Sequence, residues 1–188
     1  MANELKALVK RCLSGSTTAA LELVRQYQGQ VFGLCYRMLG HRQDAEDAVQ
    51  ETFIRVLKNL DRWDPEREFE PWLLTIAGNR CRTRLAKRMR KPALQTLDRP
   101  VVDRAYQQQT ADLLHEEVEL ALSGIRAEYK QAFLLFHEHQ LSYEEIAESM
   151  DIPLGTVKTW VYRARRQIIQ KLEQRGVVSG RTPELQRA

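Results

Sequence analysis

Residues 142–172 read SYEEIAESMDIPLGTVKTWVYRARRQIIQKL, and this stretch decides the fold of the C-terminal part of the chain. It contains two apolar stripes with helical spacing, separated by a short polar turn. The first stripe consists of Tyr143, Ile146, Ala147 and Met150, and the second consists of Val157, Val161, Ala164, Ile168 and Leu172. Each stripe needs an apolar partner, so the stretch predicts two helices packed against each other.

The turn between these helices has the chemistry of a helix-turn-helix motif. Asp151 tolerates a positive φ, and Pro153 suits the first position of a helix. Gly155 and Thr156 then fall in the opening turn of the second helix. The spacing therefore predicts a helix-turn-helix.

The second helix carries positive charge outside its apolar stripe. In helix-turn-helix proteins, the N-terminal half of this helix meets base edges in the major groove, and later cations meet phosphates. An alternative is a basic helix that only forms the solvated face of a bundle. The turn chemistry and the small Ala147 favour DNA binding instead. The predicted DNA-binding residues are Thr156, Lys158, Thr159, Tyr162, Arg163 and Arg166.

The whole chain predicts an all-α fold with two small helical domains. Its 188 residues, 43% of them hydrophobic, show helical periodicity and no convincing strand pattern. A third amphipathic helix is expected to begin after a cap at Asp44. The predicted boundaries are a first domain at 1–92, a flexible linker at 93–110, a second domain at 111–175 and a disordered tail at 176–188.

Charge is distributed unevenly along the chain, although the formal net charge is only +4. From Pro71 to Leu97 there is no Asp or Glu, while Arg and Lys accumulate between Arg80 and Lys91. Like charges at this density repel one another, so a polyanion is the natural partner.

Several classes of function lack support in the sequence. No apolar run is long enough to cross a bilayer, and the N-terminus lacks a signal-peptide pattern, so we expect a cytoplasmic protein without membrane insertion. Cys12, Cys35 and Cys81 have no C-x-x-C spacing, so we expect neither a metal site nor a cofactor. An enzyme acting on nucleic acid is disfavoured because no P-loop, paired carboxylates or supported nucleophile is found.

Three segments together resemble the extracytoplasmic-function (ECF) sigma factors of bacterial RNA polymerase. DAEDAVQETFIRVLKNL from Asp44 is similar to the helix that docks on the polymerase clamp, and FEPWLLTIAGNRCRTRL from Phe69 to the segment that melts and reads the minus-ten element. The stretch from Ser142 is similar to the reader of the minus-thirty-five element. The resemblance implies a non-enzymatic factor whose partners are core RNA polymerase and promoter DNA, as duplex and melted single strand. An anti-sigma factor is a further candidate partner.

The resemblance also implies two further sets of site residues. The polymerase-binding residues are Asp44, Asp47, Gln50, Glu51 and Ile54. The minus-ten residues are Trp63, Phe69, Asn79, Arg80, Arg82 and Arg84. In the second set we expect the aromatic rings to stack on bases, Asn79 to bind a base edge and the arginines to track phosphates. The alternative is that the aromatic residues close the helical core and the arginines form a solvated face.

Three positions depart from the family pattern. Asp151 stands where the family often has Gly, and Trp160 where it often has a basic or small residue. Gly78 lies inside a predicted helix, where it costs ~1 kcal/mol relative to Ala unless a close backbone approach is useful.

A regulator that binds an operator without polymerase is the remaining alternative. It explains only the last third of the chain, and it gives no function to the acid-free helix after Pro71.

Overall fold

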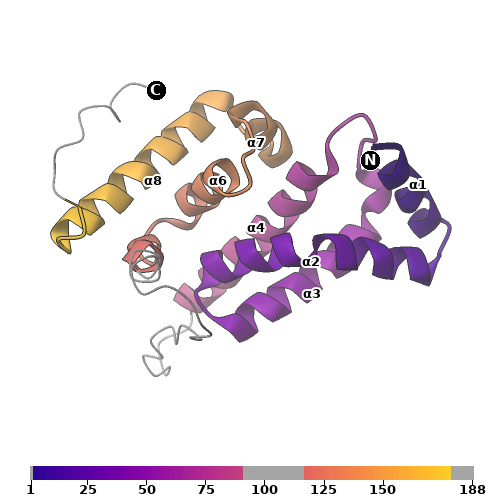
Figure 1. Cartoon of the computed structure of the whole chain (residues 1–188), viewed down its shortest axis with the longest axis horizontal. Coiled ribbons are helices and arrows are strands. Elements are labelled where there is room, and N and C mark those ends of the chain that lie inside the picture. Colours follow the sequence, from indigo (N-terminus) through magenta and orange to yellow (C-terminus); the bar gives the residue numbers. More distant parts are fainter. Residues whose placement is uncertain (1, 91–116, 179–188) are drawn as a thin grey trace.

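The computed structural model describes residues 2–90 and 117–178 (Figure 1). These residues are helical and contain no strand, which confirms the predicted all-α class. The helices are α1 (Ala2–Leu13), α2 (Thr17–Leu39), α3 (Arg42–Lys58), a 3₁₀ turn η1 (Leu60–Arg62), α4 (Phe69–Arg90), α6 (Ala127–His137), α7 (Tyr143–Met150) and α8 (Leu154–Gln174). A short helical segment at residues 117–122 precedes α6. The predicted linker at 93–110 and tail residues 179–188 lie outside the described residues.

Helices α1–α4 form the N-terminal domain. The apolar stripes of α2 and α4 meet in its core, and α3 packs against both helices. Large side chains that are fully buried in this core include Leu23, Leu34, Met38, Leu73 and Leu74. The core of this domain therefore lies between α2, α3 and α4.

The junction between α2 and α3 shows where the sequence sets helix ends. Gly40 ends α2 with a φ of +69°, a region that glycine enters without strain, and its N–H donates to the carbonyl of Tyr36 at 2.8 Å. The prediction that Asp44 caps α3 is wrong, because α3 begins at Arg42 with His41 as its N-cap. Asp44 lies in the first turn, and its Oδ1 is 3.6 Å from Nη1 of Arg84.

Helices α6–α8 form the C-terminal domain, and α7 and α8 form the predicted helix-turn-helix. A capping box starts α7: Ser142 Oγ accepts from the N–H of Glu145, whose carboxylate accepts from the N–H of Ser142. Asp151 takes a left-handed conformation with a φ of 53°, as its position in the turn predicts. Pro153 is the N-cap of α8 and not its first helical residue.

The two domains are in direct contact. Helix α4 packs against α6 and α7, and α2 packs against α6. Figure 1 shows α8 on the outer side of the C-terminal domain, away from α1–α4.

Candidate polymerase and nucleic-acid interfaces

Helix α8 separates an inward apolar face from an outward polar face. All five residues of its predicted apolar stripe are buried. On the outward face, Lys158, Thr159, Tyr162, Arg163 and Arg166 are exposed, and Thr156 is half-buried. The structure therefore brings the predicted minus-thirty-five residues together on one helix. An exposed cationic helix face is the electrostatic requirement for binding in a major groove.

Arg163 is held in place by Tyr129 of α6. Its Nη1 donates to the Tyr129 hydroxyl at 2.8 Å, and its Cζ lies 5.7 Å from the centre of the ring. This hydrogen bond is the largest cause that lowers the pKa of Tyr129. Trp160 also packs on Tyr129, with ring centres 6.2 Å apart, and is half-buried. Trp160 therefore fills space beside α6, which explains an aromatic residue at this position.

Sequence reasoning missed the role of Tyr129. Its side chain is 7% exposed. Its hydroxyl was the available signal, because a buried phenol requires a hydrogen-bond partner.

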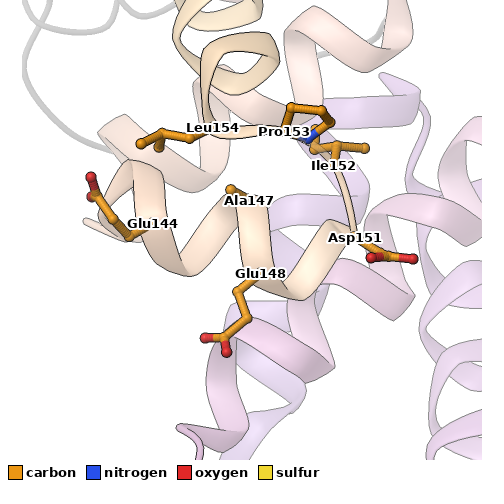
Figure 2. Close-up of a pocket in the computed structure, with 7 residues that line it drawn as sticks. All are labelled: Glu144, Ala147, Glu148, Asp151, Ile152, Pro153 and Leu154. Carbon is orange, nitrogen blue, oxygen red and sulfur yellow. The ribbon is translucent and has the colours of Figure 1, made fainter.

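The helix-turn-helix also has an acidic surface. Figure 2 shows the carboxylates of Glu144, Glu148 and Asp151 around a shallow hollow between α7 and the start of α8. Its apolar lining is Ala147, Ile152, Pro153 and Leu154. Carboxylates repel phosphate, so the charge distribution favours DNA on the cationic face of α8 and disfavours it here.

Helix α3 presents the predicted polymerase-binding residues to solvent. Asp47, Gln50 and Glu51 are exposed, and Ile54 is 56% exposed to solvent. Asp44 is half-buried. The residues on the opposite face, including Phe53 and Val56, are buried in the core. The face thus combines carboxylates with one exposed apolar side chain.

Arg84 of α4 belongs spatially to this acidic face. Its Nη2 donates to Glu51 at 2.7 Å, and its Nη1 lies 3.4 Å from Asp47 Oδ2 and 3.6 Å from Asp44 Oδ1. Hydrogen bonding to Glu51 is the largest cause that raises the pKa of Arg84. The structure therefore places Arg84 among the predicted polymerase-binding residues and separates it from the predicted strand-binding residues.

Trp63 and Phe69 do not present their rings to solvent. They are 6% and 1% exposed, and their rings meet edge to face with centres 5.3 Å apart. Phe69 also packs against Tyr27 and Trp72. The expectation that these rings stack on bases is corrected by their burial, and the alternative that they close the core is the one that fits.

The other minus-ten residues lie along α4. Asn79 is exposed, and its side-chain oxygen accepts from Arg82 Nη1 at 3.3 Å. Arg82 Nη2 also lies 3.8 Å from Glu128 of α6. Arg80 is half-buried, and its Nε has no hydrogen-bond partner within the described part of the chain. One exposed amide and two arginines therefore remain together on this helix.

Two family models match the chain: sigma-70 region 2 over residues 23–91 and sigma-70 region 4 over residues 115–168. The ECF RNA polymerase sigma factor SigW of Bacillus subtilis is 36% identical over 183 residues, covering 89% of this chain and 96% of that protein. This chain is an ECF RNA polymerase sigma factor. The sigma factor is also 33% identical to the ECF RNA polymerase sigma-E factor of Haemophilus influenzae, over 92% of this chain and 98% of the relative.

Solved structures share the fold of this sigma factor. CnrH, in complex with the cytosolic domain of CnrY, superposes with a TM-score of 0.63 at 25% identity, over 89% of this chain and 96% of CnrH. The sigma factor RpoE, in complex with the anti-sigma factor NepR from Bartonella quintana, superposes with a TM-score of 0.62 at 21% identity. The match covers 81% of this chain and 95% of the chain in that structure.

Family membership defines the activity of the chain. The protein directs promoter-specific transcription initiation through regions 2 and 4, and sigma factors are initiation factors and not enzymes. In the described ranges, no helix is long and apolar enough to cross a membrane. Within those same ranges, no group of three His, Cys, Asp or Glu side chains is placed to hold a metal ion.

Proposed function

We propose that this sigma factor reads the minus-thirty-five element with the outward face of α8. The carrying observation is the separation of that helix into a fully buried apolar stripe and an exposed face with Lys158, Arg163 and Arg166. Arg163 lies in the N-terminal half of α8, where base edges are read, and Arg166 lies further along, where phosphates are met. The hydroxyl of Tyr129 supports this assignment because it limits the positions that the Arg163 guanidinium adopts.

The minus-ten element is assigned to α4 in this proposal. Exposed Asn79 binds a base edge, and Arg80 and Arg82 follow the phosphates of the melted strand. The buried rings of Trp63 and Phe69 support the shape of this site from within the core instead of stacking on a base.

Core polymerase is assigned to the outward face of α3. Asp47, Gln50 and Glu51 offer charge and hydrogen-bonding groups, and Ile54 offers apolar surface. Charged rim contacts of this kind steer a partner and set the register of docking. Since core polymerase and promoter DNA are cytoplasmic, the protein works in the cytoplasm.

An anti-sigma factor is a further partner in this proposal. The complex of RpoE with the anti-sigma factor NepR is the precedent, and this chain shares the RpoE fold. A binding assay with a cognate anti-sigma protein tests this part separately.

In vitro transcription with core polymerase and genomic DNA tests the proposal as a whole. The wild-type protein should start transcripts at a defined set of promoters. Asn79→Ala should still recruit polymerase to duplex promoters but leave thymines near the start site weakly reactive to permanganate. A template with a mismatched minus-ten region should restore part of its transcription. If Asn79→Ala melts an intact duplex promoter as the wild type does, Asn79 does not bind a base edge of the minus-ten element.

The alternative of an operator-binding regulator makes a different prediction. Such a protein shifts duplex DNA tightly and sequence-specifically in the absence of polymerase. The sigma factor should require core polymerase for specific binding.

A further inference from the structure

Arg165 of α8 is a half-buried cation that lies beside the minus-thirty-five residues but does not belong to that set. Lys158, Tyr162 and Arg165 follow one another at positions i, i+4 and i+7, so they share one flank of the helix. Because Lys158 and Tyr162 are exposed, this flank borders the outward face of α8. The rise of an α-helix places the Cα atoms of Lys158 and Arg165 about 10 Å apart along the axis.

The side chain of Arg165 is held by His137, the last residue of α6. Its Nη2 lies 3.2 Å from Nε2 of His137. A guanidinium has donors and no acceptor, so His137 must offer a lone pair at Nε2 and carry its proton on Nδ1. The imidazole in this pair is therefore neutral. Partial burial is the largest cause that lowers the pKa of His137, and the charge of Arg165 lowers it further.

Aromatic rings fix the orientation of the His137 imidazole. Its ring centre lies 4.4 Å from that of Phe133 and 4.9 Å from that of Phe136, both on α6. Phe136 stacks on Tyr143 of α7, with ring centres 4.4 Å apart and 6° between the ring planes. Nζ of Lys158 lies 5.9 Å from the centre of the Tyr143 ring. One row of rings therefore runs from the imidazole to the cation of Lys158.

Lys158, Arg163 and Arg165 of α8 all have partners without charge. Those partners are the face of an aromatic ring, a phenol hydroxyl and an imidazole nitrogen, in that order. Arginines of α2 and α4 lie against carboxylates instead. A carboxylate cancels the charge of the arginine that it holds, whereas a neutral acceptor restricts the arginine and leaves its charge to attract an anion.

We propose that Arg165 is a further phosphate-binding residue of the minus-thirty-five site and that His137 is its positioning residue. The neutral imidazole holds the guanidinium on the flank of α8, and the full charge of Arg165 remains available to the DNA backbone. Phosphate contacts fix the register and orientation of a protein on the duplex, and base contacts read the sequence. The phosphate contact rests on the proposed function of α8, whereas the pair of Arg165 and His137 does not.

Protonation of His137 should break this pair. A protonated imidazole has no acceptor and repels the guanidinium of Arg165, so the hydrogen bond requires a pH above the pKa of His137. That pKa lies below its ordinary value of 6.5, so the pair is intact at neutral pH. The titratable neighbours of the imidazole are Arg165 on α8 and, beyond the ring of Phe136, Tyr143 on α7. Glu138 does not replace His137 in acid solution, because its carboxylate pairs with an arginine of α2 at 2.7 Å.

Nuclear magnetic resonance of the four histidines in the full chain tests the pair without polymerase or DNA. His137→Gln removes one imidazole signal and so assigns it. At neutral pH the nitrogen chemical shifts of the assigned ring should show the proton on Nδ1. Arg165→Ala should raise the pKa of His137 and increase the share of the tautomer with its proton on Nε2.

The control for this measurement is Arg25→Ala, which removes an exposed arginine of α2. It should leave the pKa and the tautomer of His137 at their wild-type values. If Arg165→Ala also leaves both unchanged, the pair does not exist in solution and the proposal is overturned.

Promoter binding by the holoenzyme, on a duplex promoter found in the transcription experiment, tests the phosphate contact. Arg165→Ala should weaken binding several-fold to all minus-thirty-five variants alike and reduce the slope of log K against log salt by about 0.9. Arg25→Ala should change neither quantity. An unchanged slope in Arg165→Ala alone would overturn this contact. An unchanged slope in Arg166→Ala as well would overturn the proposed function of α8 too.

Two substitutions of His137 separate positioning from packing. Gln and Glu have nearly the same size and each offers an oxygen acceptor, but only Glu cancels the charge of Arg165. His137→Gln should keep the affinity and salt slope of the wild type, while His137→Glu should lose nearly as much as Arg165→Ala. In an Arg165→Ala background, the two variants should differ much less. Equal binding of the promoter by His137→Gln and His137→Glu, strong or weak, would overturn the positioning role.

Discussion

Arg84 and Glu51 join two helices that the sequence assigned to different partners. The Arg84 Nη2 on α4 lies 2.7 Å from the Glu51 Oε1 on α3, and the Arg84 side chain is only 24% exposed. An arginine half-enclosed by carboxylates is not free to follow a DNA strand. The polymerase-binding face therefore includes a residue of the helix proposed to melt the promoter, and substitutions in α3 act on α4 as well.

Reversing the charge on this face should remove polymerase binding. In the double variant Asp47→Lys with Glu51→Lys, two new cations lie beside Arg84, and the carboxylates proposed to meet the clamp are lost. We expect a loss of several kcal/mol in affinity for core polymerase, measured in a competition assay. Glu22→Lys is the control, because it reverses an exposed carboxylate that pairs with Arg11 but lies on α2 and not on α3, and it should compete nearly as well as the wild type. Undiminished competition by the double variant would show that α3 is not the docking face.

Arg163 and Arg166 should have different effects on promoter choice. Arg163→Ala should relax discrimination at one base pair by ~1–3 kcal/mol, whereas Arg166→Ala should weaken all promoters alike and reduce the salt dependence. Binding to a series of minus-thirty-five variants at several salt concentrations measures both effects. Tyr129→Phe keeps the ring and loses the hydroxyl that holds Arg163. It should reduce discrimination at the same base pair by less than Arg163→Ala does. The reverse pattern for the two arginines would exchange their roles.

Phe69→Ala should act through stability and not through base stacking. Phe69 is 1% exposed, and truncating a buried phenylalanine costs about 3–5 kcal/mol. Urea denaturation should therefore show a much lower unfolding free energy. Ile54→Ala, at a position that is 56% exposed, should change it by less than about 0.5 kcal/mol. Wild-type stability with defective melting would instead restore the stacking role.

The folded chain should gain stability as pH rises above 8. Burial is the largest cause that lowers the pKa of Lys130 from 10.5 to about 8; Glu119, Cys81 and Glu138 raise it and Lys171 lowers it. Between these two values the unfolded chain binds more protons at Lys130, so folding gains free energy with rising pH, up to roughly 3 kcal/mol. As pH falls through 8 this gain is lost. Urea denaturation at pH 7 and pH 10 measures the effect, and Lys130→Met should remove this contribution. Lys158→Met, at an exposed position, should retain it.

Sequence reasoning predicts the parts of this structure that depend on local periodicity. The stripe of α8, the left-handed Asp151 and the end of α2 at Gly40 all follow from residue type and spacing. It does not decide whether Trp63 and Phe69 are buried, because Trp63 lies outside any helical period and Phe69 is the first residue of α4. Local periodicity also does not predict contacts between residues that are far apart in the sequence.

The neighbour of Gly78 shows that limit, since a Cβ added to Gly78 would lie 2.8 Å from Cγ of Gln131 on α6. A glycine inside a predicted helix indicates a close neighbour, but not which one. Gln131 lies 53 positions further along the chain, and its proximity depends on how two separate domains pack.

Residues on different faces of helix α4 have different neighbours. Leu74 faces the core, Arg84 contacts α3, Gly78 lies against α6 and Asn79 faces solvent. A substitution in this helix therefore changes the packing or the charge of at least one of these contacts. Among homologous chains, α4 should accept few substitutions, and those at positions 78 and 131 should occur together, a larger residue at one being offset by a smaller residue at the other.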